Sequence, residues 1–246
     1  MVEAAMIAEQ ANPQIIDLNF GCPVKKIANK GGGSGMLRDI PKLIEMTDQV
    51  IKSVNIPVTV KTRLGWDENN LVIVDLAERL QDIGVQGLTI HGRTREQMYT
   101  GEADWTLIGE IKNNPRMKIP IIGNGDVDSG EKAKLMFDRY GVDGIMIGRA
   151  SIGNPYIFKE IRHYLETGKK LPELVLKEQI DNLKYMISQS IKWKGETSGI
   201  IGMRRHMAKK FNDLPDFRPL RIQMLRSETK DKLWETFDEI KNKYSS

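Results

Sequence analysis

The sequence predicts an α/β fold with a parallel sheet, followed by a region made only of helices. Over the first 150 residues, five short apolar runs rich in β-branched residues alternate with stretches of helical spacing. Such alternation is typical of repeated βα units. After residue 150 the apolar residues recur only at helical spacing. The 246 residues, 40% hydrophobic and 28% charged, are enough for one large domain and a smaller one.

The five apolar runs are the expected strands, at residues 15–20, 56–61, 87–91, 119–124 and 144–149. Few polar residues interrupt them, so we expect them to be buried on both faces of the sheet. Helices are expected between the strands at residues 40–54, 71–83 and 130–140. Four more are expected after the strands, at residues 155–167, 174–191, 202–212 and 227–243.

Each expected strand ends in polar residues or glycine rather than in an ordinary turn. The endings are Asn19-Phe20-Gly21-Cys22, Lys61-Thr62-Arg63, His91-Gly92-Arg93, Asn124-Gly125-Asp126 and Gly148-Arg149. Functional groups at the ends of several successive parallel strands are typical of a barrel, whereas an open doubly wound sheet gathers its site at one switch point. We therefore predict an incomplete TIM (β/α) barrel with about five of eight strands at residues 1–153, and an all-α domain at residues 154–246.

The single cysteine, Cys22, lies in the first of these strand ends. A lone thiol can form neither an intrachain disulfide nor a thiolate metal cluster, so it serves packing or chemistry. Packing is the commoner use. Gly21 and Pro23 restrain the backbone on both sides, however, which suits a side chain that must be aimed. We predict a catalytic role for Cys22. One cysteine and scattered histidines give no zinc-ligand spacing, so no metal is expected.

A phosphate site is expected near the last two strand ends. Gly148 and Arg149 precede an expected helix, and a glycine with free N–H groups beside a guanidinium can hold a phosphate. The segment Asn124-Gly125-Asp126 would form the other half, because barrels often bind phosphate after the last two strands. The alternative is a tight turn at Gly148 and a surface charge at Arg149.

Lys61 and His91 end neighbouring strands at the same level. A partly desolvated lysine there suits an electron-rich heterocycle that gains negative charge on reduction. The alternatives are a lysine whose charged end reaches solvent and a hydrogen-bonded core histidine. Because both residues lie near Cys22 and Arg149 in the expected fold, we favour contact with a ligand.

The glycine run at residues 31–35 is not a P-loop, since no Gly-Lys-Ser/Thr follows it. We expect a mobile loop over the site, in which glycines allow a substrate to approach the backbone.

Charge is unevenly distributed along the chain. Residues 1–150 hold 18 Lys and Arg against 20 Asp and Glu, whereas residues 151–246 hold 19 against 13. The run 203–211 places Arg204 and Arg205 on one expected helix. A basic C-terminal part predicts contact with a polyanion there, and a solvated helical surface is the alternative.

No apolar run approaches the roughly 18–20 residues that span a bilayer. The N-terminus carries acid where a secretory signal would carry base. With one cysteine, a cytoplasmic location without a membrane partner is expected.

Taken together, these residues resemble the tRNA-dihydrouridine synthases, and most closely their bacterial B-type branch. The resemblance runs from about residue 1 to about residue 240. The motifs that carry it are residues 17–26 (DLNFGCPVKK), 58–65 (VTVKTRLG), 88–94 (LTIHGRT), 123–126 (GNGD), 143–150 (DGIMIGRA) and 203–206 (MRRH).

The resemblance implies bound FMN, with NADPH (or NADH) as reductant and tRNA as substrate. A hydride passes from the reduced flavin to C6 of a flipped-out uracil, and a cysteine thiol protonates C5. Cys22 matches that proton donor, and a thiol is largely protonated near neutrality. The implied flavin contacts are Lys61, His91, Asn124, Gly125, Asp126, Gly148 and Arg149. The implied substrate contacts are Asn19, Arg63, Arg204 and Arg205.

The family pattern also includes an earlier strand ending in Pro-Met beneath the flavin and a third strand that supplies a glutamine. Neither is found ahead of Cys22, so we expect the chain to be an N-terminally truncated form with weak or absent FMN retention. A purified yellow protein with stoichiometric flavin would contradict this expectation. The alternatives are a barrel flavoenzyme acting on a small metabolite, similar to dihydroorotate dehydrogenase, and a non-catalytic RNA-binding remnant. A monomer is expected.

Overall fold

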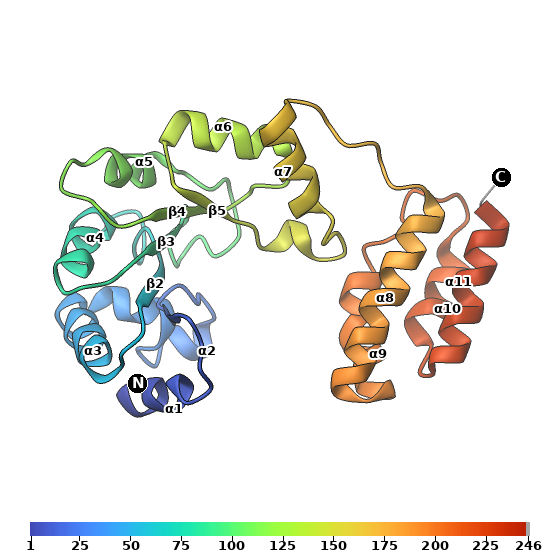
Figure 1. Ribbon diagram of the computed structural model, residues 1–246, viewed down its shortest axis with the longest axis horizontal. Coiled ribbons are helices and arrows are strands. Elements are labelled where there is room, and N and C mark those ends of the chain that lie inside the picture. Colours follow the sequence, from blue (N-terminus) through green and yellow to red (C-terminus); the bar gives the residue numbers. More distant parts are fainter. Residues whose placement is uncertain (245–246) are drawn as a thin grey trace. The chain divides into compact units, whose positions relative to one another are not determined.

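The structure is a computed structural model that describes residues 1–244. The chain forms two compact units, Met1–Gly148 (unit 1) and a second that begins at Arg149 (unit 2). Figure 1 shows the sheet and its helices in unit 1, and helices in unit 2.

Unit 1 is built on a five-stranded parallel sheet whose strands follow chain order. They are β1 Ile16–Asn19, β2 Val58–Arg63, β3 Leu88–His91, β4 Ile121–Asn124 and β5 Gly144–Met146. Each strand pairs with the next one along the chain, as in the wall of a β/α barrel. Within the described residues β1 and β5 do not pair with each other, so the sheet is open. The predicted α/β fold and incomplete barrel are confirmed.

The strands are joined by helices α3 Ile40–Ser53, α4 Ile73–Asp82, α5 Thr106–Asn113 and α6 Gly130–Tyr140. In Figure 1, α3, α4 and α5 line one side of the sheet. Their ends carry local signals. The Asp39 side chain accepts a hydrogen bond from Lys42 N (3.2 Å) at the start of α3, and Ser129 does the same for Lys132 N (3.2 Å) in α6. The sequence did not predict α5, a helix of eight residues.

The two faces of the sheet differ in polarity. Leu18, Val60 and Ile90 are buried on the helix-covered face, while alternate residues point to the other face. That second face carries polar side chains at the strand ends, and β1 there exposes Asp17 and Asn19. The expected burial on both faces holds for the central strand β3 but is wrong for β1 and for β5, which has no buried residue. The strands β1 and β5 lie at the edges of the open sheet, where fewer neighbouring side chains cover them.

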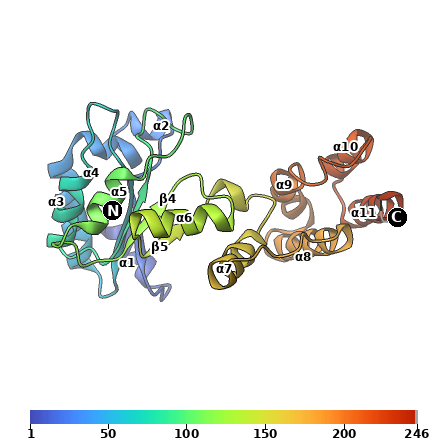
Figure 2. The same ribbon diagram turned by 90° about the horizontal axis from the view of Figure 1, so that it is seen from above.

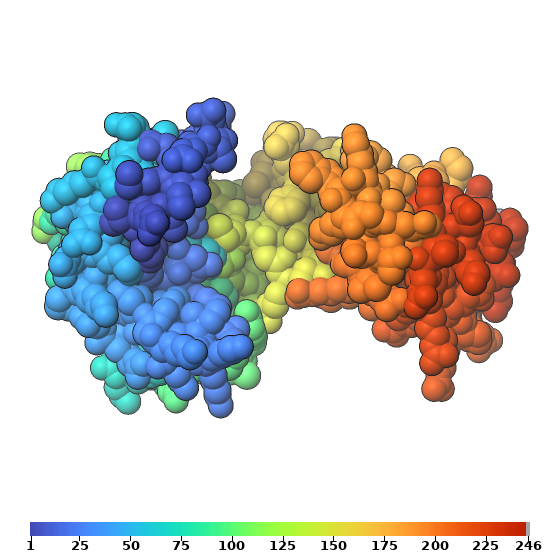
Figure 3. All heavy atoms as spheres, turned by 90° about the horizontal axis from the view of Figure 1, so that it is seen from below, coloured from blue at the N-terminus to red at the C-terminus, as the bar shows by residue number. Residues whose placement is uncertain are grey.

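Three short helices precede α3 and were not predicted: α1 Val2–Glu9, α2 Lys25–Ala28 and the 3₁₀ helix η1 Gly33–Arg38. Helix α1 exposes Met6 and Ile7, and Figure 3 shows it in dark blue on the surface of unit 1. Its apolar residues lack a helical stripe, which is why their spacing gave no signal.

The glycine run at residues 31–35 is exposed at Gly31 and packed at its C-terminal end, and its predicted mobility stays a prediction. Ser34 and Gly35 are buried within η1. A Cβ on Gly35 would lie 2.1 Å from the Ala28 carbonyl oxygen, and one on Gly33 would lie 2.9 Å from Cys22 Cβ. These glycines therefore allow η1 to approach α2 and the cysteine loop.

Unit 2 contains η2 Arg149–Ser151, α7 Ile157–Thr167, α8 Leu176–Lys194, α9 Glu196–Met207, α10 Arg218–Arg226 and α11 Lys230–Tyr244. Helices α8 to α11, labelled in Figure 2, share one apolar core that includes Ile187, Met207, Met224 and Phe237. The sequence placed α9 six residues too late and missed α10. Among residues 1–244, no helix combines the length and apolar character that crossing a membrane requires.

Candidate active site

The loop after β1 holds Cys22 in a fixed backbone conformation. Gly21 N donates to the Asn19 Oδ1 atom (2.9 Å). Ser34 donates both its backbone N–H (3.1 Å) and its hydroxyl (2.7 Å) to the Cys22 carbonyl oxygen. The Cys22 side chain itself is half-buried. Hydrogen bonds at Gly21 and at the Cys22 carbonyl oxygen therefore fix the backbone that bears the thiol, at the carboxyl end of β1.

Arg63 fastens the same loop from β2. It is only 2% exposed, and its Nε donates to the Gly21 carbonyl oxygen (2.8 Å). Its Nη1 donates to the carbonyl oxygens of Thr94 (2.8 Å) and Met98 (3.0 Å) in the loop after β3. These bonds join two strand-end loops and make Arg63 a positioning residue. Its contact with substrate stays a prediction.

Lys61 lies beside the cysteine loop on the polar face of the sheet. Its Nζ is 3.5 Å from the point where a Cβ on Gly21 would lie, and in the strand register it is opposite Asn19. Burial lowers the pKa of Lys61 below its ordinary value. The charge of Arg63 acts in the same direction, and that of Asp17 opposes it. The structure thus brings Asn19, Lys61 and the cysteine loop together.

His91 ends β3 and is 7% exposed. Burial is the main cause that lowers its pKa from 6.5 to about 3, and the charges of Arg63, Lys61 and Arg93 add to this. The imidazole is therefore neutral at physiological pH. Its Nδ1 atom is buried and has no hydrogen-bond partner within the described residues. An unpartnered buried polar atom is costly, and here it leaves one position on the polar face for a ligand.

The low pKa of His91 predicts a pH dependence of stability. Between pH 3 and 6.5 the unfolded chain binds a proton at this histidine that the folded chain does not, so stability falls as the pH drops through that window. From pH 7 to pH 5 the loss should be about 1–2 kcal/mol. Urea unfolding at the two pH values measures this loss of stability. The variant His91→Gln should show a smaller loss. A His91 ring proton NMR signal that titrates near pH 6 would contradict the assignment.

Asn124 and Gly125 shape the end of β4. Asn124 Nδ2 donates to the Met146 carbonyl oxygen (2.7 Å) and ties β4 to β5. Gly125 has φ +128°, a conformation that favours glycine. Its carbonyl oxygen accepts a hydrogen bond from the indole Nε1 of Trp105 (3.2 Å). Contact of these two residues with a flavin phosphate stays a prediction.

Asp126 forms an ion pair with Arg93 that the sequence did not predict. Its carboxylate accepts hydrogen bonds from both terminal nitrogens of Arg93 and from Ala103 N (2.8 Å). Arg93 is 2% exposed and also donates to the Thr100 and Gly101 carbonyl oxygens. Arg93 largely balances the negative charge of Asp126 and so reduces the repulsion between this carboxylate and a phosphate. A role for Asp126 near a flavin phosphate stays a prediction.

Arg93 and Trp105 are the two site residues that sequence reasoning missed. Arg93 follows a strand end, as Arg63 does, but only the fold shows that it reaches Asp126. Trp105 lies in an ordinary apolar stretch of the sequence. The one indication of its position is that Gly123 has no side chain, because a Cβ there would lie 1.9 Å from the indole ring.

The two remaining phosphate-site residues fall on either side of the division between the units. Gly148 ends unit 1, and Arg149 begins unit 2 in η2. A Cβ on Gly148 would meet nothing within 4 Å. The phosphate cradle shared by Arg149, Asn124 and Gly125 stays a prediction, because Arg149 belongs to unit 2 and the other two residues belong to unit 1.

In unit 2, the C-terminal half of α9 is cationic. Arg205 is exposed, Arg204 is half-buried, and the buried Nε of Arg204 has no partner within the described residues. His206 Nδ1 accepts a hydrogen bond from Gly153 N (3.1 Å). Burial, then the charges of Arg205 and Lys209, lower the pKa of His206, so this imidazole adds no charge at neutral pH. The positive charge here comes from the arginines and lysines.

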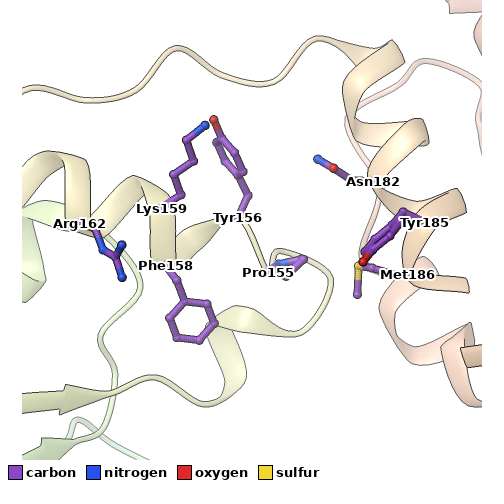
Figure 4. Close-up of a pocket in the computed structure, with 8 residues that line it drawn as sticks. All are labelled: Pro155, Tyr156, Phe158, Lys159, Arg162, Asn182, Tyr185 and Met186. Carbon is purple, nitrogen blue, oxygen red and sulfur yellow. The ribbon is translucent and has the colours of Figure 1, made fainter. Parts of the chain in front are cut away.

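Helices α7 and α8 border a groove of about 460 Å³. Its lining residues are Pro155, Tyr156, Phe158, Lys159, Arg162, Asn182, Tyr185 and Met186. Two are cations, three are aromatic, and none is acidic. Figure 4 shows Lys159 and Tyr156 extending together, with Lys159 Nζ 5.1 Å from the tyrosine ring. Exposed rings beside cations are the side-chain types that contact unpaired nucleotides.

The fold and the site define an incomplete β/α barrel whose chemical groups gather at the carboxyl ends of its strands. The chain belongs to the dihydrouridine synthase (Dus) family, whose model matches residues 1–245.

Named relatives support the same assignment. The chain is 42% identical to tRNA-dihydrouridine synthase B of Pseudomonas aeruginosa, over 94% of this chain and 69% of that protein. It is 41% identical to a probable tRNA-dihydrouridine synthase 1 of Synechocystis, over 92% and 63%. For a probable tRNA-dihydrouridine synthase of Rickettsia bellii the identity is 36%, over 99% and 75%. The chain thus matches about two thirds of the length of these relatives.

Proposed function

We propose that this chain carries out the reduction of uridine to 5,6-dihydrouridine in tRNA, with FMN as cofactor and NADPH or NADH as reductant. The observation that carries the proposal is the fastened Cys22 loop beside Lys61, in a chain that matches the dihydrouridine synthase family over residues 1–245. A cytoplasmic location and a monomeric state remain predictions from the sequence.

The residues of the polar face fit a flavin. Lys61 offers a cation, His91 offers a neutral imidazole whose Nδ1 has no partner among the described residues, and Gly125 keeps the backbone accessible at the end of β4. Reduced FMN supplies a hydride, which C6 of the uracil ring accepts. Lys61 favours negative charge on the ring that it contacts, because a half-buried cation interacts more strongly than a solvated one.

Cys22 supplies the matching proton. Hydride addition at C6 leaves C5 of the uracil ring to be protonated, and the thiol S–H is the donor, so that the C5–C6 double bond becomes a single bond with one hydrogen added to each carbon. Ser34 donates to the Cys22 carbonyl oxygen and Arg63 to that of Gly21, and these bonds thereby direct the thiol. Positioning of this kind supplies much of the benefit of a general acid.

The helical unit would bind the tRNA. A uridine must leave its stack to reach a reagent inside a barrel, and the protein must then hold the surrounding RNA by its phosphates and its unpaired bases. The cations of α9 and the aromatic groove of α7 and α8 support this role. The predicted tRNA contacts Arg204 and Arg205 both lie on α9.

Replacing Arg204 and Arg205 with glutamine should weaken tRNA binding and reduce the slope of log affinity against log salt by about one per lost phosphate contact. Fluorescence anisotropy with labelled tRNA between 50 and 300 mM salt measures both quantities. A double variant on α11, Lys232→Gln with Lys241→Gln, removes the same charge and should alter the slope less. An unchanged slope in the Arg204/Arg205 variant would assign these arginines to the solvated surface.

The function itself is tested by incubating the chain with unmodified tRNA, NADPH and an excess of FMN, because weak FMN retention is expected, and measuring dihydrouridine by mass spectrometry of the nucleosides. The expected result is a gain of two hydrogens in one or a few uridines. Binding of tRNA without any reduction, even with chemically reduced FMN, would favour an RNA-binding remnant. Reduction of free pyrimidines but not of tRNA would favour a small-metabolite flavoenzyme.

A further inference from the structure

Two arginines share one indole ring at the carboxyl edge of the sheet. The guanidinium carbon of Arg38 lies 4.1 Å from the Trp66 ring centroid, and that of Arg95 lies 4.4 Å from it. The three residues come from separate segments: Arg38 ends η1, Trp66 follows β2, and Arg95 follows β3. Cation–π attraction to Trp66 therefore holds two positive charges close together.

The loops that carry this cluster are joined by backbone hydrogen bonds. Arg95 N donates to the Gly65 carbonyl oxygen (3.0 Å), and Glu96 N donates to that of Trp66 (2.9 Å). The cluster is thus preorganised before any ligand arrives.

Among residues 1–244, neither guanidinium has a polar side chain as a partner. Within residues 1–244, no side-chain hydrogen bond or ion pair to Arg38 or Arg95 is present, and the buried Nε of Arg95 is unpartnered. Nearby acids are engaged elsewhere: Asp67 accepts hydrogen bonds from Asn69 and Asn70, and Glu68 accepts one from Gln97. Arg38 is exposed and Arg95 is half-buried, so an anion could reach both guanidinium groups and accept charge-assisted hydrogen bonds from them.

The cluster is also linked to the cysteine loop. Helix η1, which ends at Arg38, contains Ser34, and Ser34 donates two hydrogen bonds to the Cys22 carbonyl oxygen. An anion held by Arg38 would therefore lie on the same packed segment that fixes the thiol.

We propose that Arg38 and Arg95, held over Trp66, bind a backbone phosphate of the RNA next to the nucleotide that Cys22 protonates. The inference rests on the proposed function for the identity of the RNA. Planar guanidinium groups with free donors match phosphate oxygens in pairs. The guanidinium groups already cover the Trp66 ring, so this ring is not available to stack on a base. The cluster therefore binds the RNA through its phosphate backbone.

The first experiment needs no activity. The Nε–H signals of Arg38 and Arg95 are assigned in NMR spectra from the single variants Arg38→Gln and Arg95→Gln, and the chain is then titrated with a five-nucleotide oligouridylate or with inorganic phosphate. The expected result is a saturable shift of both signals with the oligonucleotide, at concentrations at which phosphate moves them little. Equal response to inorganic phosphate would make this a free-anion site and overturn the proposal, as would the absence of any shift.

The second experiment measures tRNA affinity against salt for the double variant Arg38→Gln/Arg95→Gln. The salt slope should fall by about one, because the double variant loses one phosphate contact. The control, Lys52→Gln/Lys118→Gln, removes two exposed lysines, one in the last turn of α3 and one in the loop before β4. It should leave the slope within about 0.5 of the wild-type value. Equal slopes in the two double variants would overturn the proposal. Wild-type chain that shifts with oligouridylate but never reduces tRNA would refute the proposed function alone.

Discussion

Replacing Cys22 with alanine should slow uridine reduction by about 100- to 10,000-fold while leaving tRNA affinity nearly unchanged. The substitution removes the proton donor but leaves the hydrogen bonds to the Cys22 carbonyl oxygen, which involve only its backbone. Single-turnover formation of dihydrouridine, started with reduced FMN so that the reductive step is bypassed, measures the rate. Anisotropy with labelled tRNA measures binding.

Two further variants separate the role of the Cys22 thiol as an acid from the role of the Ser34 hydrogen bonds that hold its backbone. Cys22→Ser keeps nearly the same shape but offers a much weaker acid, so it should be almost as slow as the alanine variant. Ser34→Ala keeps the thiol and loses one of two hydrogen bonds to the Cys22 carbonyl oxygen, so its loss of rate should be far smaller. Normal turnover in Cys22→Ala would remove this residue from the mechanism.

Replacing Trp105 with alanine should destabilise unit 1 by about 3–5 kcal/mol, a large share of the 5–15 kcal/mol typical of a folded protein. Trp105 is 1% exposed, packs against the bare backbone of Gly123, and donates to the Gly125 carbonyl oxygen. Its removal leaves a cavity beneath the end of β4. Urea unfolding followed by circular dichroism measures the loss.

The matched control is Trp193→Ala on α8. Trp193 is 84% exposed, so its truncation should change stability by at most about 0.5 kcal/mol. Trp105→Phe should fall between the two, because it keeps most of the ring and loses the indole N–H. A shift for Trp105→Ala no larger than that of Trp193→Ala would show that the ring does not support the end of β4.

Local pattern was sufficient for the repeated strand–helix units. The strand ending at His91 and the helix Gly130–Tyr140 were located to within a residue, since each combines a clear period with end signals such as Ser129 and Gly141. Helix α1 and η1 were missed because α1 has no apolar stripe and η1 is a glycine-rich turn whose form depends on packing against Ala28.

The candidate site was predicted in part for the same reason. Residues near the ends of strands, such as Lys61 and His91, can be brought to one edge by topology alone. The prediction that these two lie at the same level is wrong, because the register places His91 opposite Arg63 and Lys61 opposite Thr89. The partners of Arg63 and Asp126 could not be predicted, because these bonds cross between loops that are 30 or more residues apart in the chain.

By itself the sequence determined the βα repeat, the helical C-terminal part, the single thiol and the order of the strand-end motifs, because each of these depends on neighbouring residues or on periodicity. Only the tertiary structure decided which of those groups remain available. Arg63 and Asp126 are engaged in hydrogen bonds across loops, His91 is neutral through burial, and Arg38 and Arg95 both lie over the Trp66 ring. The physical reason is that desolvation and the choice of hydrogen-bond partner depend on which segments meet in space.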